Sequence, residues 1–417
     1  MVKKLRSPGV QNQLWTIISS GLGAVYTSLL LLLTTRLIGL KDAGILSYSV
    51  AISELLRMLV VLGVRNYQST DIRQEFSFNT YLFLRTLSSL FAIAILIVVI
   101  LVGRSDSYRV VVLVLFFFTY LTDKYADVFM GDLQQKGKMR IAGRMRAAGF
   151  GGALIAFAIV SFITHKLIVS LAFAGIAMFL INIAWVWFNR QHFGSIQIKA
   201  DFKVIKKLTL STLPIAISTS LFSYMYNAQK YYLGALGSDE DVAIIAILMQ
   251  PAMLLYLFFS FFFVGAELTK MAEVFTSGQT KQFSRQISKL LVLVGGLSML
   301  FIVCAYIFGL PLLSWLYGID LSSYKMQFML LSCGGLFFSV SILLRSVLIV
   351  MRMQRIALYC MVAVALVTGL LMWYLVSHYG FTGAAFSNLV IFAPLSIAYY
   401  WAYKHALLAK SQACDIE

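Results

Sequence analysis

Two long apolar segments near the start of the chain are joined by Arg36-Leu-Ile-Gly-Leu-Lys-Asp-Ala-Gly-Ile-Leu-Ser-Tyr-Ser49. About half the chain later, two others are joined by Lys230-Tyr-Tyr-Leu-Gly-Ala-Leu-Gly-Ser-Asp-Glu-Asp-Val-Ala243. In each stretch, a cation near the end of one segment is followed by apolar residues, a glycine, an acidic turn and a new segment. This correspondence predicts that the chain is built from two repeated halves.

The composition outside these stretches is that of an integral membrane protein. The 417 residues are 60% hydrophobic and only 12% charged, with a mean hydropathy of +0.86, which is too apolar for a soluble protein of this size. Apolar runs of about 17–25 residues, long enough to cross about 30 Å of hydrocarbon, recur along the chain. We predict an all-α fold with twelve spans: Leu14–Arg36, Ala43–Val64, Leu82–Val102, Val110–Met130, Ala147–Ile163, Leu167–Phe188, Leu210–Leu233, Val242–Val264, Leu290–Phe308, Met326–Val350, Ile356–Val376 and Ala384–Tyr403.

The loops predict the orientation of the spans. Lys and Arg are roughly four times as numerous in the loops on the side of the termini, so both termini are expected in the cytoplasm. The net charge of +17 then reflects topology, and the basic loops lack the aromatic residues of a nucleic-acid platform. We expect an N-terminal six-helix bundle over residues 1–188, a basic cytoplasmic linker over 189–207 and a C-terminal six-helix bundle with a short tail over 208–417.

Charged residues within the spans are the main functional signal. A cation at the bilayer centre costs about 2.5–3.5 kcal/mol on insertion scales, so such residues usually face a polar cavity or a counter-ion. Acids at comparable depth are fewer: Glu54, Asp123 and Asp127. The excess of cations indicates a cavity that receives an anionic ligand, lined by basic residues from this set: Arg57, Arg85, Lys124, Lys230 and Arg345.

The three acids allow two interpretations. Glu54 and Arg57 are three residues apart, as are Lys124 and Asp127, so they can form pairs that lower the cost of insertion. Asp123 and Asp127 also lie one turn apart, and intramembrane carboxylates often couple transport to a proton or cation. The sequence leaves open whether the acids only balance charge or couple transport to protons or sodium.

Two spans of the repeat also carry polar stripes. Thr27 belongs to a set spaced seven residues apart in the first span, and Ser223, Asn227 and Lys230 share one face of the seventh. Such stripes can join helices or line a cavity wall. The second interpretation adds Thr27, Ser223, Asn227 and the repeat cation Arg36 to the candidate binding residues.

Several functions are excluded by missing features. The chain has no G-x-x-x-x-G-K-[ST] loop for nucleotide phosphates and no Cys or His spacing of a metal site. The predicted loops are too short for a soluble catalytic domain, and no span carries a catalytic histidine. We therefore expect no enzyme and no cofactor, which leaves a transporter.

The quoted stretches also resemble a known family. Asn12–Ile72, with Thr35-Arg36-Leu-Ile-Gly-Leu-Lys-Asp-Ala-Gly and Leu62-Gly-Val-Arg65, is similar to the polysaccharide transporter (Wzx-type O-antigen flippase) family of the multidrug/oligosaccharidyl-lipid/polysaccharide superfamily. Gln229-Lys230-Tyr-Tyr-Leu-Gly and Tyr379-Gly-Phe-Thr-Gly-Ala-Ala385 resemble later parts of the family pattern. The chain departs from that pattern at Gln229, where the family often has an aspartate.

The resemblance implies a MATE-like, V-shaped fold of two six-helix bundles around a central cavity in a bacterial inner membrane. It implies a flippase that moves undecaprenyl-pyrophosphate-linked repeat units to the outer leaflet for O-antigen, capsule or exopolysaccharide assembly. Partners would be this glycan lipid, membrane lipid, and a polymerase and chain-length regulator of the same pathway. The alternative is a multidrug cation antiporter of the same superfamily, for which buried acids and aromatic residues would be expected instead of buried Lys and Arg.

Overall fold

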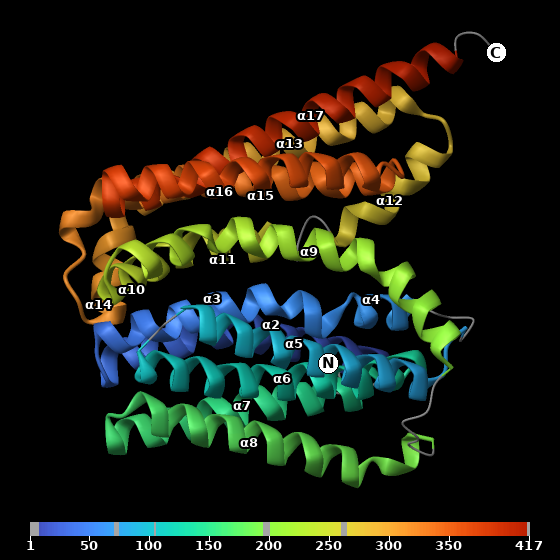
Figure 1. The fold of residues 1–417 in the computed structure, drawn as a ribbon. Coiled ribbons are helices and arrows are strands. Elements are labelled where there is room, and N and C mark those ends of the chain that lie inside the picture. Colours follow the sequence, from blue (N-terminus) through green and yellow to red (C-terminus); the bar gives the residue numbers. More distant parts are fainter. Residues whose placement is uncertain (1–7, 71–74, 104–105, 195–200, 260–264, 415–417) are drawn as a thin grey trace. The chain divides into compact units, whose positions relative to one another are not determined.

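The computed structural model describes residues 8–70, 75–103, 106–194, 201–259 and 265–414, and their regular elements are all helical (Figure 1). The chain divides into two compact units, Met1–Ser223 (unit 1) and Tyr224–Glu417 (unit 2), with the boundary inside one long helix. Of the linker expected at 189–207, residues 195–200 lie outside the described residues. Its end already belongs to that helix, which begins at Phe202.

Unit 1 is a bundle of long helices that run side by side (Figure 1). Helix α2 packs on α7, α7 on α8, α8 on α6, and α3 on both α5 and α6. Its elements are α2 (Pro8–Leu37), α3 (Leu40–Val61), α4 (Val64–Thr70), α5 (Phe78–Gly103), α6 (Ser107–Gln135), α7 (Met139–Thr164), α8 (Leu167–Phe188), the 3-10 turn η1 (Arg190–His192) and the first part of α9 (Phe202–Leu236).

The first quoted stretch forms a tight turn between α2 and α3. Helix α2 ends at Leu37, and Gly39 has φ of +150°, a conformation that favours a residue without Cβ. Asp42 lies in the first turn of α3, where a negative charge is favoured by the helix dipole, and it accepts a hydrogen bond from the Tyr108 hydroxyl. The acidic turn in the sequence is therefore a helix start.

The second quoted stretch has the same local structure in unit 2. Helix α9 ends at Leu236, and Ser238 caps α10 (Asp239–Leu248) by accepting from the backbone N–H of Asp241 at 3.1 Å. The Asp241 carboxylate accepts from the N–H of Ser238 at 3.2 Å, which completes a capping box. Both stretches are thus helix–turn–helix connections with an acid in the first turn.

The remaining elements of unit 2 are α11 (Gln250–Phe259), α12 (Gly265–Thr276), α13 (Thr280–Cys304), the π-helical turn η3 (Ala305–Gly309), α14 (Leu310–Tyr317), the 3-10 turn η4 (Ser322–Tyr324), α15 (Lys325–Val350), α16 (Gln354–Ala385) and α17 (Ser387–Cys414). Helix α17 packs along α15, where a Cβ at Gly334 would lie 2.8 Å from backbone atoms of α17. Gly380 has φ of +53° and kinks α16. Helix α16 continues past this kink to Ala385, and the last helix begins at Ser387, a few residues after the expected Ala384.

Fewer described helices than the twelve predicted are both long and apolar enough to cross a membrane. Within the described residues nine helices have this length and hydropathy. The number is ten when the two arms of α9, which are bent by 40° around Pro214, count as one span. The predicted fourth and twelfth spans fall on α6 and α17, which are long helices but less apolar. Charges at residues 123, 124 and 127 interrupt the apolar run of α6, and three tyrosines interrupt that of α17.

Two apolar clusters of unit 1 frame a charged layer. One contains Phe116 of α6 and packs α2, α3, α7 and α8 together, and the other contains Phe129 and Leu133 of α6 with residues of α4 and α5. Along α6, Asp123 and Lys124 lie between the two clusters. Asp123 and Lys124 are accordingly largely buried, with 9% and 12% of their side chains exposed.

Candidate functional site

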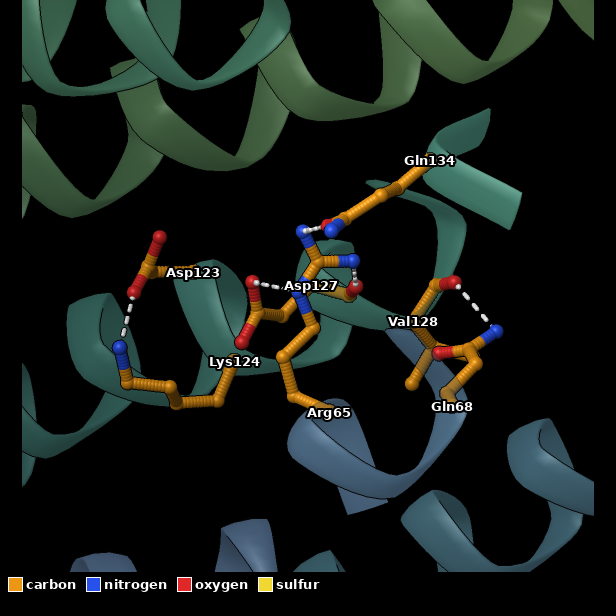
Figure 2. A network of polar contacts seen from close by, with 7 residues as sticks. All are labelled: Arg65, Gln68, Asp123, Lys124, Asp127, Val128 and Gln134. Atoms are coloured by element: carbon orange, nitrogen blue, oxygen red, sulfur yellow. Dashed lines mark hydrogen bonds and ion pairs between the residues drawn. The ribbon is translucent and has the colours of Figure 1, made fainter. Parts of the chain in front are cut away.

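Three ion pairs lie together on α3, α4 and α6. Lys124 Nζ lies 2.6 Å from a carboxylate oxygen of Asp123, and Arg57 Nη1 lies 3.3 Å from Glu54 Oε2. Asp127 pairs with Arg65, whose Nε lies 3.6 Å from Asp127 Oδ1 (Figure 2). Asp123 and Asp127 thus have different cationic partners, and the partner of Asp127 comes from α4.

The pair between Arg65 and Asp127 also fixes α4 against α6. Arg65 Nη2 donates to Gln134 Oε1 at 2.8 Å, and the fully buried Gln68 donates to the carbonyl oxygen of Val128 at 3.2 Å (Figure 2). These contacts are possible because α3 ends at Val61 and the chain turns before α4. Leu62 and Gly63 have positive φ values of 42° and 66° in this turn.

Gly131 of α6 makes room for α4. A Cβ at this position would lie 2.0 Å from Gln68 Oε1 and 2.9 Å from Arg65 Nη1. We expect Gly131→Ala to push the ends of the Gln68 and Arg65 side chains aside, to weaken their hydrogen bonds to α6 and to destabilise unit 1 by about 1–3 kcal/mol, the usual cost of overpacking. The measurement is the apparent Tm of the purified protein in detergent.

Gly151→Ala on α7 is the matched control, since nothing lies within 4 Å of a Cβ there. An alanine in a helix interior is intrinsically favoured over glycine, so this variant should be at least as stable as the wild type. Equal Tm values for both alanine variants would contradict the close packing of α4 on α6.

The ion pairs line two adjoining cavities in unit 1. The first, of about 200 Å³, is lined by charged side chains of α3, α4 and α6 and by Thr219 and Ser220 of the part of α9 in unit 1. The second, of about 140 Å³, lies among α2, α3, α6, α7 and α8. Glu54, Arg57 and Lys124 belong to the walls of both cavities, so the two are neighbours.

Cations outnumber acids on these walls. The acids are Glu54, Asp123 and Asp127, and the cations are Arg57, Arg65, Lys124 and Arg146. Each acid has a cationic partner within 4 Å, and Arg146 lies over the ring of Phe150. The lining therefore carries a net positive charge when all of these groups are ionised.

Most of the predicted binding and coupling residues of the N-terminal half meet at these cavities. Thr27 lines the second cavity, and Ser223 donates to the carbonyl oxygen of Glu54 at 3.4 Å. Arg36 does not join them, because it is exposed in the last turn of α2. The predicted residues on the cavity walls are Thr27, Glu54, Arg57, Asp123, Lys124 and Asp127.

The other predicted binding residues belong to unit 2. Lys230 of α9 is buried, and its ammonium donates to Asn227 Oδ1, also buried, at 3.1 Å. Arg345 is half-buried on α15 and lies near Tyr399 of α17. Gln229, the residue before Lys230, is fully buried, and its side-chain oxygen accepts a hydrogen bond from the hydroxyl of Ser387 at 3.0 Å. The position of the frequent family aspartate therefore holds a neutral hydrogen-bonded amide.

Arg85 has a structural contact instead of a place on either cavity wall. It is fully buried, and its Nη1 donates to the carbonyl oxygen of Val60, which also accepts from Ser88 Oγ at 2.9 Å. Val60 lies in the last turn of α3, where carbonyls lack helical partners and basic groups are favoured. Arg85 thus caps the C-terminus of α3 just before its break.

Sequence reasoning missed Arg65 and Arg146, which lie just outside the predicted spans Ala43–Val64 and Ala147–Ile163. Arg65 could have been suspected from Leu62-Gly63, since a glycine next to a basic residue at a span end permits a turn back toward the bundle. Arg146 is four residues before Phe150 on α7, so the two share a helix face directed at α2.

Comparisons with known proteins agree with this architecture. Residues 214–375 match the MatE family. The chain is 22% identical over 405 residues to the capsular polysaccharide biosynthesis protein CapF of Staphylococcus aureus, covering 95% of this chain and 99% of CapF.

The fold is similar to solved structures along most of its length. An inward-facing multidrug resistance MATE family transporter of the MOP superfamily matches with a TM-score of 0.72, 14% identity and coverage of 93% and 95% of the two chains. The lipid II flippase MurJ in an inward closed conformation matches with a TM-score of 0.70, 13% identity and coverage of 97% and 90%. Together these matches show that the chain has a MATE-like fold, and its described residues contain nine or ten helices that are long and apolar enough to cross a membrane.

Proposed function

We propose that the chain is a flippase that moves a polyprenyl-diphosphate-linked oligosaccharide from the cytoplasmic to the outer leaflet of a bacterial inner membrane. The observation that carries the proposal is the positively charged cavity of unit 1. Arg57, Arg65 and Lys124 line it together, and a diphosphate is a ligand that guanidinium and ammonium groups bind with charge-assisted hydrogen bonds. The cargo is the class handled in capsule, O-antigen or exopolysaccharide assembly, and the name of the relative CapF supports that class.

The ion pairs of the cavity suit a ligand that is bound and later released. Each cation has a carboxylate partner, so its charge is stabilised when the cavity holds no anion. A diphosphate can share or replace these carboxylates, which makes binding an exchange of partners. This exchange of partners costs less free energy than removing the hydration water of an unpaired cation. When the carboxylate pairs with the cation again, it favours release of the diphosphate.

A multidrug cation antiporter is the alternative, since the fold also occurs in multidrug transporters. An organic cation would require a cavity with excess negative charge. Here the acids of the lining are paired with cations, and Arg146 adds a further positive charge. The charge balance favours the anionic cargo.

Transport would occur by alternating access of two six-helix bundles, residues 1–188 and 208–417, joined by the cytoplasmic linker 189–207. We propose twelve spans, with α6 and α17 crossing the membrane despite their polar residues. Both termini would lie in the cytoplasm, as the distribution of Lys and Arg in the loops indicates. A cytoplasm-active reporter fused to the C-terminus should be active, and an activity found only outside the cell would contradict this orientation.

The carboxylates Glu54, Asp123 and Asp127 are the candidates for coupling transport to protons or sodium. If they couple transport, Asp123→Asn will bind cargo but lose the response of transport to an imposed pH or sodium gradient. If transport by this variant responds normally to both gradients, Asp123 only balances the charge of Lys124, with which it pairs.

The central test compares an anionic and a cationic probe on the purified protein. Farnesyl diphosphate should bind the wild type, and Arg57→Gln and Lys124→Gln should each weaken binding about tenfold to a hundredfold, because each removes a charge-assisted contact. Ethidium should bind neither the wild type nor the variants. The control is Lys136→Gln, because Lys136 pairs with Asp132 at the end of α6 and lines neither cavity.

The same assay separates the two functions. Binding of ethidium without binding of farnesyl diphosphate would favour the multidrug antiporter. Equal binding of farnesyl diphosphate by the wild type, Arg57→Gln and Lys124→Gln would show that the cationic cavity is not the recognition site.

A further inference from the structure

The second cavity of unit 1 has a chemistry different from the first. It measures about 140 Å³, and its walls combine aromatic rings with polar groups. Since a water molecule occupies about 30 Å³ of liquid, the cavity has room for a group several waters in size. The aromatic residues on its walls are Tyr26, Phe116, Tyr120 and Phe150.

Three polar atoms on these walls are buried and lack hydrogen-bond partners among the described residues. They are the hydroxyls of Tyr26 and Tyr120 and the Nε of Arg146. Both tyrosines are more than nine-tenths buried, with exposed fractions of 6% and 9%. A buried polar atom without a hydrogen-bond partner costs about 1–3 kcal/mol of folding free energy. Three such atoms on the walls of one cavity therefore indicate that a bound polar ligand supplies their hydrogen-bond partners.

The charges on the walls restrict the ligand. Glu54 and Asp123 offer carboxylate acceptors, while Arg57, Lys124 and Arg146 offer donors. Three cations disfavour a metal ion, and two carboxylates disfavour a free anion. A neutral ligand with several hydroxyl groups fits both sets, because each hydroxyl both donates and accepts.

We propose that this cavity is the subsite for the sugar attached directly to the diphosphate, an inference that rests on the proposed flippase function. The sugar hydroxyls hydrogen-bond to the Tyr26 and Tyr120 phenols, to the carboxylates and to Arg146. The apolar C–H face of the ring packs on the aromatic side chains, whose faces carry negative charge density. The walls thus recognise both sides of a sugar ring.

The connection between the cavities supports this assignment. In a prenyl-diphosphate sugar the anomeric carbon is bonded to a phosphate oxygen, so the two subsites must adjoin. Glu54, Arg57 and Lys124 belong to both cavities, with Arg65 and Asp127 on the diphosphate side and Tyr26 and Tyr120 on the sugar side.

The test measures how much a sugar adds to binding of the diphosphate. The full-length protein is titrated with farnesyl diphosphate and with farnesyl diphosphates bearing glucose, galactose, N-acetylglucosamine or N-acetylgalactosamine. We expect at least one sugar-bearing probe to bind about tenfold more tightly than farnesyl diphosphate. Tyr26→Phe and Tyr120→Phe should each reduce this gain about threefold to tenfold, the effect of one lost hydrogen bond, and leave binding of farnesyl diphosphate unchanged.

Tyr125→Phe is the matched control. Tyr125 lies on the same helix as Tyr120, but its hydroxyl is 3.1 Å from Thr86 Oγ1 and it lines neither cavity. This variant should bind every probe as the wild type does, and apparent Tm values establish that all three variants are folded.

The outcomes separate this inference from the proposed function. Farnesyl diphosphate binding without a gain from any sugar overturns the subsite, which then holds water only, and leaves the flippase proposal standing. A gain that neither cavity variant reduces places the sugar elsewhere and also overturns the subsite. Failure of every probe to bind overturns both proposals together.

Discussion

Replacing Asp127 by Asn is expected to destabilise unit 1 and, at the same time, to tighten its binding of an anionic ligand. Asp127 pairs with Arg65 at 3.6 Å and also interacts electrostatically with Lys124, Arg146 and Arg85. Asparagine keeps the size of the side chain but removes the charge that these cations share. Breaking a buried pair costs about 3–5 kcal/mol, and we expect the lower end because the Arg65 side chain remains 21% exposed.

The same substitution should strengthen binding of farnesyl diphosphate about tenfold, because the anion no longer competes with a carboxylate for Arg65. Transport of a sugar-bearing prenyl diphosphate in reconstituted vesicles should nevertheless fall, since the group that favours release is missing. Apparent Tm in detergent, titration with farnesyl diphosphate and vesicle transport measure the three effects separately.

Two further variants test the cause. Asp132→Asn is the control, because Asp132 lies on the same helix and pairs with Lys136 at 2.6 Å but lines neither cavity. It should leave the affinity for farnesyl diphosphate unchanged. The double variant Arg65→Gln/Asp127→Asn should recover part of the lost Tm, because it removes both partners. If Asp127→Asn changes neither stability nor affinity, the pair has no part in anion binding.

Lys230→Ala is expected to reduce transport to less than about a tenth of the wild-type rate while leaving the amount of protein in the membrane near normal. Lys230 is buried in α9, and its ammonium donates to Asn227 Oδ1. If Lys230 binds the cargo as the sequence predicts, the loss of one charge-assisted contact accounts for about tenfold or more. Lys230→Arg keeps the charge and should retain more activity than Lys230→Ala.

Arg345→Ala should have a similar effect if Arg345 also binds the cargo. Lys325→Ala is the control in unit 2, because Lys325 is exposed at the start of α15 and lies over the ring of Tyr306. Vesicle transport at matched protein amounts is the measurement. Wild-type rates in both the Lys230 and the Arg345 variants would show that these cations do not bind cargo.

Much of the fold could be predicted from local sequence signals. Hydropathy predicted the positions of the long helices, and α8 begins at Leu167 and ends at Phe188 as expected. The acidic turns at Asp42 and Asp239 predicted helix starts that the structure contains. Hydropathy also predicted the helix at residues 110–130, which α6 contains, but the charges of α6 make it less apolar than the helices long and apolar enough to cross a membrane.

The candidate site could be predicted only in part. Glu54 with Arg57 is a local pair at helical spacing, and the structure contains it. Lys124 has an aspartate on either side along α6. Helical spacing predicted a pair with Asp127, whereas in the structure Lys124 pairs with Asp123. The cation for Asp127 comes from a different helix, and no spacing along α6 could indicate it.

The sequence by itself determined the helical membrane fold and the presence of charges within it, because hydropathy and helical period depend only on near neighbours in the chain. The tertiary structure decided which charges share a cavity. Gly63 lets the chain turn after α3, and Gly131 leaves room for α4, so Arg65 reaches Asp127 while Arg85 is held at the end of α3. Such pairings depend on the distance between helices, and that distance is set by packing across the whole unit.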